Sequence, residues 1–88
     1  MSNRTHGAPQ HTIECIDNYV KHRLHPGGFV TAVLCNDLRE AIARADHVNI
    51  KHLVEIVAYC WNEIPHTCWG SEENVVNWLS QKGTNGED

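Results

Sequence analysis

Two glycine-bearing segments hold the residue types in this chain that are best suited to ligand binding. His25-Pro26-Gly27-Gly28 precedes one helical pattern, and Cys68-Trp69-Gly70-Ser71 precedes another. Glycine lets a ligand approach the backbone closely, and N–H groups at a helix start attract anions such as phosphate. A tryptophan ring adds a surface on which a base can stack. Together the two segments hold the minimum that a nucleotide site requires.

Polar residues that follow the first segment add further candidate contacts. Asn36 and Asp37 lie one to two turns into the helical pattern, where they suit recognition of a base edge or ribose, or fixation of the loop. Arg39 and Arg44 supply positive charge for a phosphate, from the same chain or from a neighbouring subunit. The complete set of expected ligand-binding residues is His25, Gly27, Gly28, Phe29, Asn36, Asp37, Arg39, Arg44, Trp69, Gly70 and Ser71.

The same two segments also suit purely structural roles. Pro-Gly-Gly is a common tight turn, and an indole ring such as that of Trp69 is a common core residue. From the residue types alone, ligand binding and turn formation are equally supported.

Metal binding is considered because the chain has seven histidines and four cysteines. His22-x-x-His25 and the group of Cys60, His66 and Cys68 are the candidate ligands. However, the sequence has no C-x-x-C motif, and a structural zinc site needs four ligands at a recognisable spacing. We therefore expect no metal and no cofactor, with the histidines solvated or capping helices.

Catalysis has little support in the sequence. His25, Asn36 and Asp37 are polar groups near one loop, but they show no order of nucleophile, base and orienting group. We therefore expect a protein that is not an enzyme.

Composition limits the partners and the cellular location. The net charge is −4, and the seven lysines and arginines are scattered, which argues against binding of a DNA or RNA duplex. No apolar run has the length of a membrane span, and the N-terminus lacks the hydrophobic segment of a signal peptide. These features predict an intracellular protein that does not bind membranes and has reduced cysteines.

The hydrophobic pattern predicts a single all-α domain. We expect a flexible N-terminus over residues 1–11, a compact four-helix domain over 12–82, and a flexible tail over 83–88. The first three helices are expected at about 12–23, 28–45 and 50–63, and the fourth after Ser71 and ending before Gly83. Thr12, Asn49 and Ser71 are the expected N-caps, and Pro65 ends the third helix.

The apolar faces of two helices suggest how they pack. The third helix has one core stripe, made of Ile50, Leu53, Val54, Val57, Cys60, Trp61 and Ile64. The second helix is apolar on two sides, so we expect a homo-oligomer, a tetramer built from dimers, with Phe29 and Val33 near a subunit contact. The alternative is that this helix is central and is surrounded by the other three.

Three segments together resemble a group of small phage and prophage proteins. They are PGGFVTAVLCNDLREAIARAD, the helical run LVEIVAYCWNEIP, and CWGS. The shared pattern is PGGF-[LV]-x-AVL-x-NDL, then A-x-x-RAD, then CWGS, and the resemblance covers about residues 13–80. The group is identified as the anti-CBASS cyclic-nucleotide sponge family.

The resemblance implies a non-enzymatic phage protein that forms oligomers. Such a protein sequesters cyclic nucleotide immune signals, such as 3′3′-cGAMP, in the cytoplasm of the infected bacterium. The implied partner is a cyclic di- or oligonucleotide, although no motif distinguishes one cyclic nucleotide from another. The alternative function is inhibition of a host protein by direct protein–protein binding.

Overall fold

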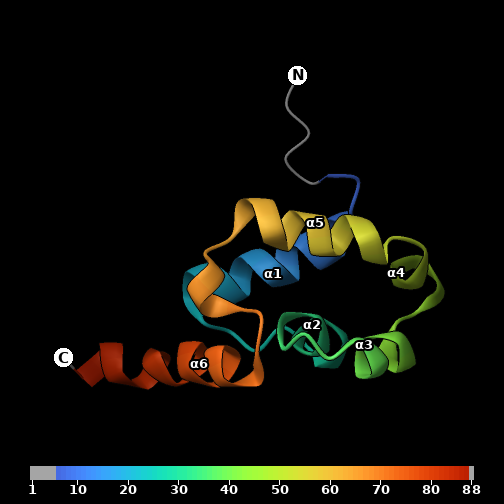
Figure 1. The fold of residues 1–88 in the computed structure, drawn as a ribbon. Coiled ribbons are helices and arrows are strands. Elements are labelled where there is room, and N and C mark those ends of the chain that lie inside the picture. Colours follow the sequence, from blue (N-terminus) through green and yellow to red (C-terminus); the bar gives the residue numbers. More distant parts are fainter. Residues whose placement is uncertain (1–5, 88) are drawn as a thin grey trace.

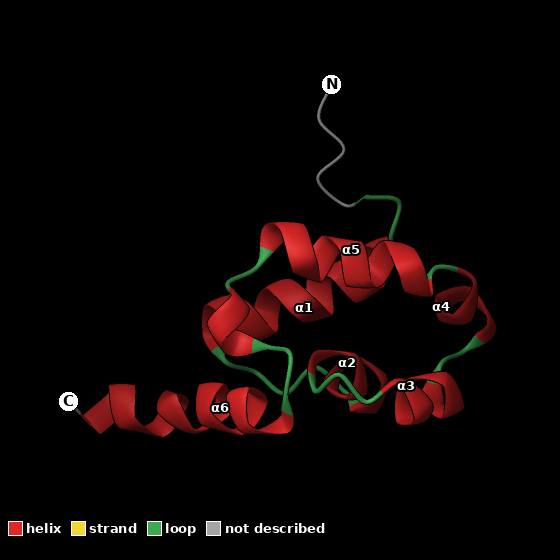
Figure 2. Ribbon diagram, in the orientation of Figure 1, coloured by secondary structure: helices red, strands yellow, loops and turns green. Residues whose placement is uncertain are grey.

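The computed structural model describes residues 6–87, with side chains for residues 6–81. These residues form helices and no strands (Figure 2). In chain order the elements are α1 (Gln10–His22), α2 (Gly28–Leu34), α3 (Leu38–Arg44), α4 (His47–Lys51), α5 (Leu53–Glu63), the 3₁₀ helix η1 (His66–Cys68) and α6 (Glu72–Glu87). α1 and α5 lie side by side, and α2 packs against α1, α3 and α6 (Figure 1). The all-α prediction is confirmed. The number of helices differs from the prediction, because the described residues form six α-helices and one 3₁₀ helix and the sequence predicted four helices.

The second predicted helix is interrupted at Asn36 and Asp37. α2 ends in a Schellman motif, in which the Asn36 N–H donates to the Val33 carbonyl (3.0 Å) and the Asp37 N–H to the Ala32 carbonyl (2.9 Å). Asn36 has a φ of 62°, a left-handed conformation that asparagine tolerates better than most residues. Asp37 then caps α3, because its carboxylate accepts a hydrogen bond from the Glu40 N–H (3.2 Å). The single-helix prediction was therefore wrong.

The capping role of Asp37 can be tested by mutation. Replacing Asp37 with alanine should lower the free energy of unfolding by about 0.5–2 kcal/mol, because α3 loses its N-cap. Asp37→Ser keeps a side-chain oxygen that can cap the helix, so it should cost less. Urea unfolding followed by circular dichroism measures both variants, and equal losses in the two would contradict a capping role.

The third predicted helix is also two helices. His52, with a φ of −115°, separates α4 from α5. α4 is capped by Asp46, whose carboxylate accepts hydrogen bonds from the N–H groups of Val48 (3.1 Å) and Asn49 (2.8 Å). Asn49, the predicted N-cap, lies inside α4, and its side-chain oxygen accepts a hydrogen bond from the Thr12 hydroxyl (2.6 Å). Asp46 precedes Asn49 in the chain and takes the capping position.

α1 begins earlier than the sequence predicted. Pro9 precedes its first turn, and Gln10 and His11 are helical. Thr12, the predicted N-cap, is a buried helical residue instead, and Ala8 is also buried. Part of the segment expected to be flexible therefore packs against the core, whereas residues 1–5 lie outside the described residues.

The predicted signals around α6 have mixed outcomes. α5 ends before Pro65, as expected, and the Ser71 hydroxyl accepts a hydrogen bond from the Asn74 N–H (3.1 Å), as an N-cap does. The predicted end before Gly83 is wrong, because α6 continues to Glu87. Residue 88 of the predicted tail lies outside the described residues.

Tyr19 connects the core to the elements that carry Trp69. Its ring is fully buried, and its hydroxyl donates to the Cys68 carbonyl (2.7 Å). The Trp78 indole N–H donates to the Tyr19 carbonyl (3.0 Å), and the Arg23 guanidinium lies 4.0 Å from the Trp78 ring. The core around it consists of Ala8, Ile13, Ile16, Val30, Ala32, Val33, Leu34, Ala41, Ile56, Tyr59, Cys60, Ile64, Cys68 and Val75. α1 thereby holds η1 and α6 in place.

The two apolar sides of the second predicted helix have different surroundings. Val33 is buried in the core of its own chain, and Phe29 is half-buried. Leu38 and Ile42, from the other side, are exposed on α3. Val33 is therefore not available for the predicted subunit contact.

The predicted core stripe of the third helix is largely exposed. Val54 is 79% exposed, Trp61 is 64% exposed and Val57 is 39% exposed. Cys60 and Ile64 of the predicted stripe are buried, and the other buried residues of α5 are Ile56 and Tyr59. The prediction for Val54, Val57 and Trp61 was therefore wrong, because α5 is apolar on most sides and its neighbours in the fold cover the side that holds Ile56 and Tyr59.

Candidate functional site

A cavity of about 620 Å³ opens between α2, α3 and the start of α6. Five of the predicted site residues line it: His25, Gly28, Asn36, Asp37 and Arg44. Its volume is within the range of about 300–1,000 Å³ that is usual for small-molecule sites. We call it the polar cavity.

Five lining residues of the polar cavity were not predicted from the sequence. They are Thr31, Glu40 and Glu72, which are polar or charged, and Ala32 and Cys35. The Thr31 hydroxyl is buried and has no hydrogen-bond partner among the described residues. An unpaired buried hydroxyl is costly, so a ligand that bonds to Thr31 would gain that interaction at little loss. The helical pattern alone gave no signal for this residue.

The charges in the polar cavity are mostly negative. Arg44 forms an ion pair with Glu40 one helical turn earlier, and both side chains are about half exposed. The carboxylates of Asp37 and Glu72 also line the cavity. Burial raises the pKa of the Cys35 thiol, and these two carboxylates raise it further, which shows that they lie near this thiol. The cavity thus combines one guanidinium with three carboxylates.

The glycine N–H groups are less available than the sequence suggested. The Gly27 N–H donates to His25 Nδ1 (3.2 Å), and the Gly70 N–H donates to the Leu34 carbonyl (2.6 Å). The start of α2, at Gly28, has no side-chain cap. Free backbone donors are therefore expected at Gly28 rather than at Gly27 or Gly70.

A second, aromatic pocket of about 320 Å³ adjoins these residues. It is lined by Asn36, Trp61, His66, Trp69 and Gly70. The rings of Trp61 and His66 lie 5.1 Å apart, centre to centre, with 30° between their planes. Asn36 lines both this pocket and the polar cavity, so the two are neighbours at the end of α2.

Trp61 and His66 were missed as site residues. Trp61 was assigned to the core stripe of the third helix, and His66 was expected, like the other histidines, to be solvated or to cap a helix. Pro65 predicts the end of α5 between these two residues, but no local pattern predicts that their rings meet.

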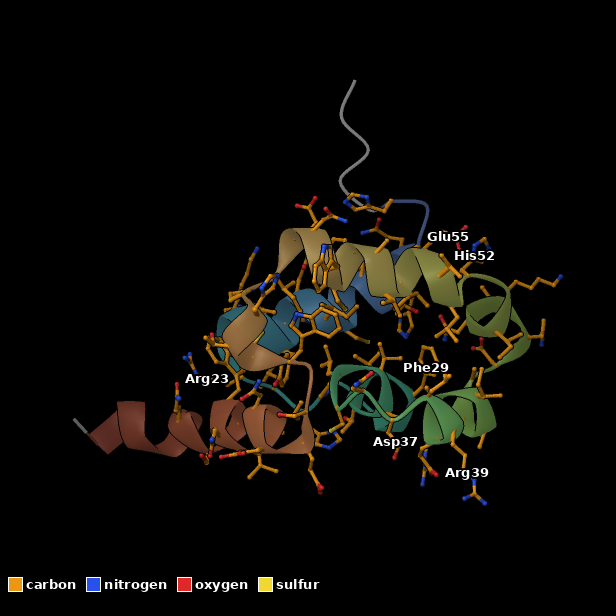
Figure 3. All side chains as sticks on the ribbon, in the orientation of Figure 1. Arg23, Phe29, Asp37, Arg39, His52 and Glu55 are labelled. Carbon is orange, nitrogen blue, oxygen red and sulfur yellow. The ribbon has the colours of Figure 1, made fainter. Side chains whose placement is uncertain are left out.

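The remaining predicted site residues lie elsewhere. Gly27 and Phe29 line a separate cavity of about 200 Å³, which Gly28 also borders. Arg39 and Ser71 line none of these three cavities. Figure 3 shows Arg39 pointing away from the rest of the molecule, while Asp37 lies at the junction of α2 and α3.

Burial of thiols predicts a loss of stability at alkaline pH. Burial raises the pKa of Cys60 from 9.0 to about 12. Above pH 9 the native state therefore binds more protons than the unfolded state, so stability is complete below pH 9 and falls as the pH rises towards 12. Between about pH 8 and about pH 10 we expect a decrease on the order of 1 kcal/mol from this thiol.

Urea unfolding under reducing conditions at the two pH values measures this decrease. In Cys60→Ala the decrease between the two pH values should be smaller than in the wild type, whatever the absolute stability of the variant. An unchanged decrease would show that Cys60 is not its source.

Two features are absent from the part of the chain that the structure describes. No helix there is long and apolar enough to cross a membrane. No three His, Cys, Asp or Glu side chains of these same residues are grouped so that they could hold a metal ion.

Comparisons with protein-family models, with curated proteins and with solved structures found no match for this chain.

Proposed function

We propose that this chain binds a cyclic di- or oligonucleotide and sequesters it without cleaving it. The observation that carries the proposal is that Asn36 joins a polar cavity to an aromatic pocket. A nucleotide has the same two parts, a flat base and a polar sugar-phosphate. The base stacks against the indole rings of the aromatic pocket, and the rest of the ligand occupies the polar cavity.

Five residues of the polar cavity suit particular parts of a nucleotide. Phosphate lies near Gly28 and Arg44. The backbone N–H groups at the start of α2 donate hydrogen bonds to it, and the Arg44 guanidinium supplies positive charge. The unpaired Thr31 hydroxyl bonds to the sugar or phosphate. The carboxylates of Asp37 and Glu72 accept hydrogen bonds from the amino groups of a base.

The motif resemblance extends the proposal to a biological role. In that role the chain is a phage-encoded sponge that acts in the cytoplasm of the infected bacterium. It removes immune signals such as 3′3′-cGAMP and so blocks the anti-phage defence.

Isothermal titration calorimetry of the full chain against 3′3′-linked cyclic dinucleotides tests the proposal. A linear dinucleotide of the same bases is the control. We expect binding of at least one cyclic ligand, which chromatography then recovers intact after denaturation of the protein. Consumption of the ligand would indicate an enzyme instead. Absence of binding across the panel would favour the alternative, inhibition of a host protein by direct contact.

A further inference from the structure

Arg44 supplies the guanidinium of the polar cavity, and contacts from two helices hold it in place. Its Nε donates a hydrogen bond to the Glu40 carboxylate (2.5 Å), one helical turn earlier on α3. Its Nη1 and Cδ lie over Gly28 of α2, where an added Cβ would come within 3.1 Å and 3.3 Å of these two atoms. The arginine side chain is therefore fixed between its own helix and α2.

This arrangement differs from an ordinary ion pair on a helix surface. A glutamate and an arginine four residues apart stabilise an exposed helix only slightly. The side chains of Glu40 and Arg44 are 45% and 57% exposed, so their pairing adds little to the stability of α3. Such a pair does not require the guanidinium to contact a second helix. Arg44 does contact α2, and both residues line the polar cavity, which points to a role in the cavity.

The pairing also determines which donors of Arg44 a ligand can use. Nε donates to Glu40, so the N–H groups that remain for a ligand are those of the two terminal nitrogens. Parallel N–H groups of a guanidinium fit two oxygens of one phosphate, which a lysine ammonium cannot do. Glu40 thus leaves Arg44 the donors that suit a phosphate group.

The charge of Glu40 does not favour an anionic ligand. Its carboxylate partly cancels the positive charge of Arg44, and the carboxylates of Asp37 and Glu72 already make the cavity acidic. Glu40 therefore does not raise affinity for phosphate through its charge. It supplies order instead, because an arginine side chain that is already fixed loses less conformational entropy when a ligand binds.

We propose that Glu40 is a positioning residue, which holds Arg44 over Gly28 so that its terminal nitrogens receive a phosphate group of the ligand. Glu40 acts through Arg44 and does not contact the phosphate itself. This inference rests on the proposed function, since it requires a ligand that contains phosphate.

The first experiment needs no ligand. NMR observes the Arg44 Nε–H signal directly, and Arg44→Lys assigns this signal by removing it. A hydrogen bond to a carboxylate slows exchange of this proton with water, so we expect a separate, slowly exchanging signal in the wild type. Glu40→Gln keeps an oxygen acceptor and should keep the signal, whereas Glu40→Ala should lose it. An unchanged signal in folded Glu40→Ala would overturn the proposal.

The second experiment titrates the full chain with inorganic phosphate and follows the NMR signals of the cavity. Glu40→Ala should weaken phosphate binding by about 2- to 12-fold, which corresponds to the cost of ordering one flexible side chain. Glu40→Gln should bind phosphate at least as tightly as the wild type, because it keeps the acceptor and removes a negative charge. This rescue is not expected if Glu40 serves only the stability of α3.

Glu14→Ala is the matched control for the phosphate titration. Glu14 is an exposed glutamate on α1 and also has a side-chain partner four residues away, since Gln10 Nε2 donates to its carboxylate (3.4 Å). Its removal should leave phosphate affinity unchanged. Phosphate that binds folded Glu40→Ala as tightly as the wild type would overturn the proposal, as would phosphate that leaves the wild-type Arg44 signal unmoved.

The positioning role and the proposed function fail in different ways. If phosphate binding at Arg44 depends on Glu40 but no cyclic nucleotide of the panel binds, the proposed function is wrong and the role of Glu40 stands. If a cyclic nucleotide binds the wild type and folded Glu40→Ala equally well, the proposed function stands and the role of Glu40 is wrong. Circular dichroism verifies that each variant is folded.

Discussion

Replacing Leu34 with alanine is expected to lower the free energy of unfolding by about 2–5 kcal/mol. Leu34 is fully buried at the end of α2, and its carbonyl accepts the hydrogen bond from the Gly70 N–H. Truncation leaves a cavity that neighbouring side chains fill only in part. Small domains are stable by only about 5–15 kcal/mol, so this loss is a large share of the total. Urea unfolding followed by circular dichroism measures it.

Leu24→Ala is the matched control, because it makes the same chemical change at a side chain that is 41% exposed. It should cost less than about 1 kcal/mol, as most surface substitutions do. Equal losses at Leu34 and Leu24 would contradict the core assigned to α2.

Replacing Trp69 with alanine is expected to weaken binding of a cyclic dinucleotide by about 5- to 150-fold, since a base–indole stack is worth about 1–3 kcal/mol. Trp69 lines the aromatic pocket, and its carbonyl accepts a hydrogen bond from the Asn74 side chain (3.0 Å), which orients this segment. Trp69→Phe keeps an aromatic face and should retain most of the affinity. Calorimetry with the ligand found in the panel measures both variants.

A second variant tests the polar half of the same site. A Cβ added at Gly28 would lie 3.1 Å from Arg44 Nη1 and 3.3 Å from its Cδ, so Gly28→Val must displace the arginine and narrow the polar cavity. We expect a loss of affinity while circular dichroism stays native. Wild-type affinity in folded Gly28→Val and in Trp69→Ala would place the binding site elsewhere.

The candidate site could be predicted from the sequence only where the signal was local. Asn36 was predicted either to contact a ligand or to fix the loop. In the structure it ends α2 and also lines both cavities. Asp37 with Glu40 three residues later has the pattern of a helix start, which would have located the break between α2 and α3. Trp61 was assigned to the core because it shares a side of the predicted helix with several other apolar residues.

The sequence by itself determined the helical class of this chain and several of its helix ends. Pro65 and Ser71 act through atoms within a few residues of themselves, so their effects can be read without the fold. Only the tertiary structure decided which side of α5 is buried, because that helix is apolar almost all round and α1 covers just one side. It also decided the pairing of Leu34 with Gly70, which brings Asn36 and Trp69 to one pocket. Such contacts join residues far apart in the chain, and their free energy depends on packing that no local pattern encodes.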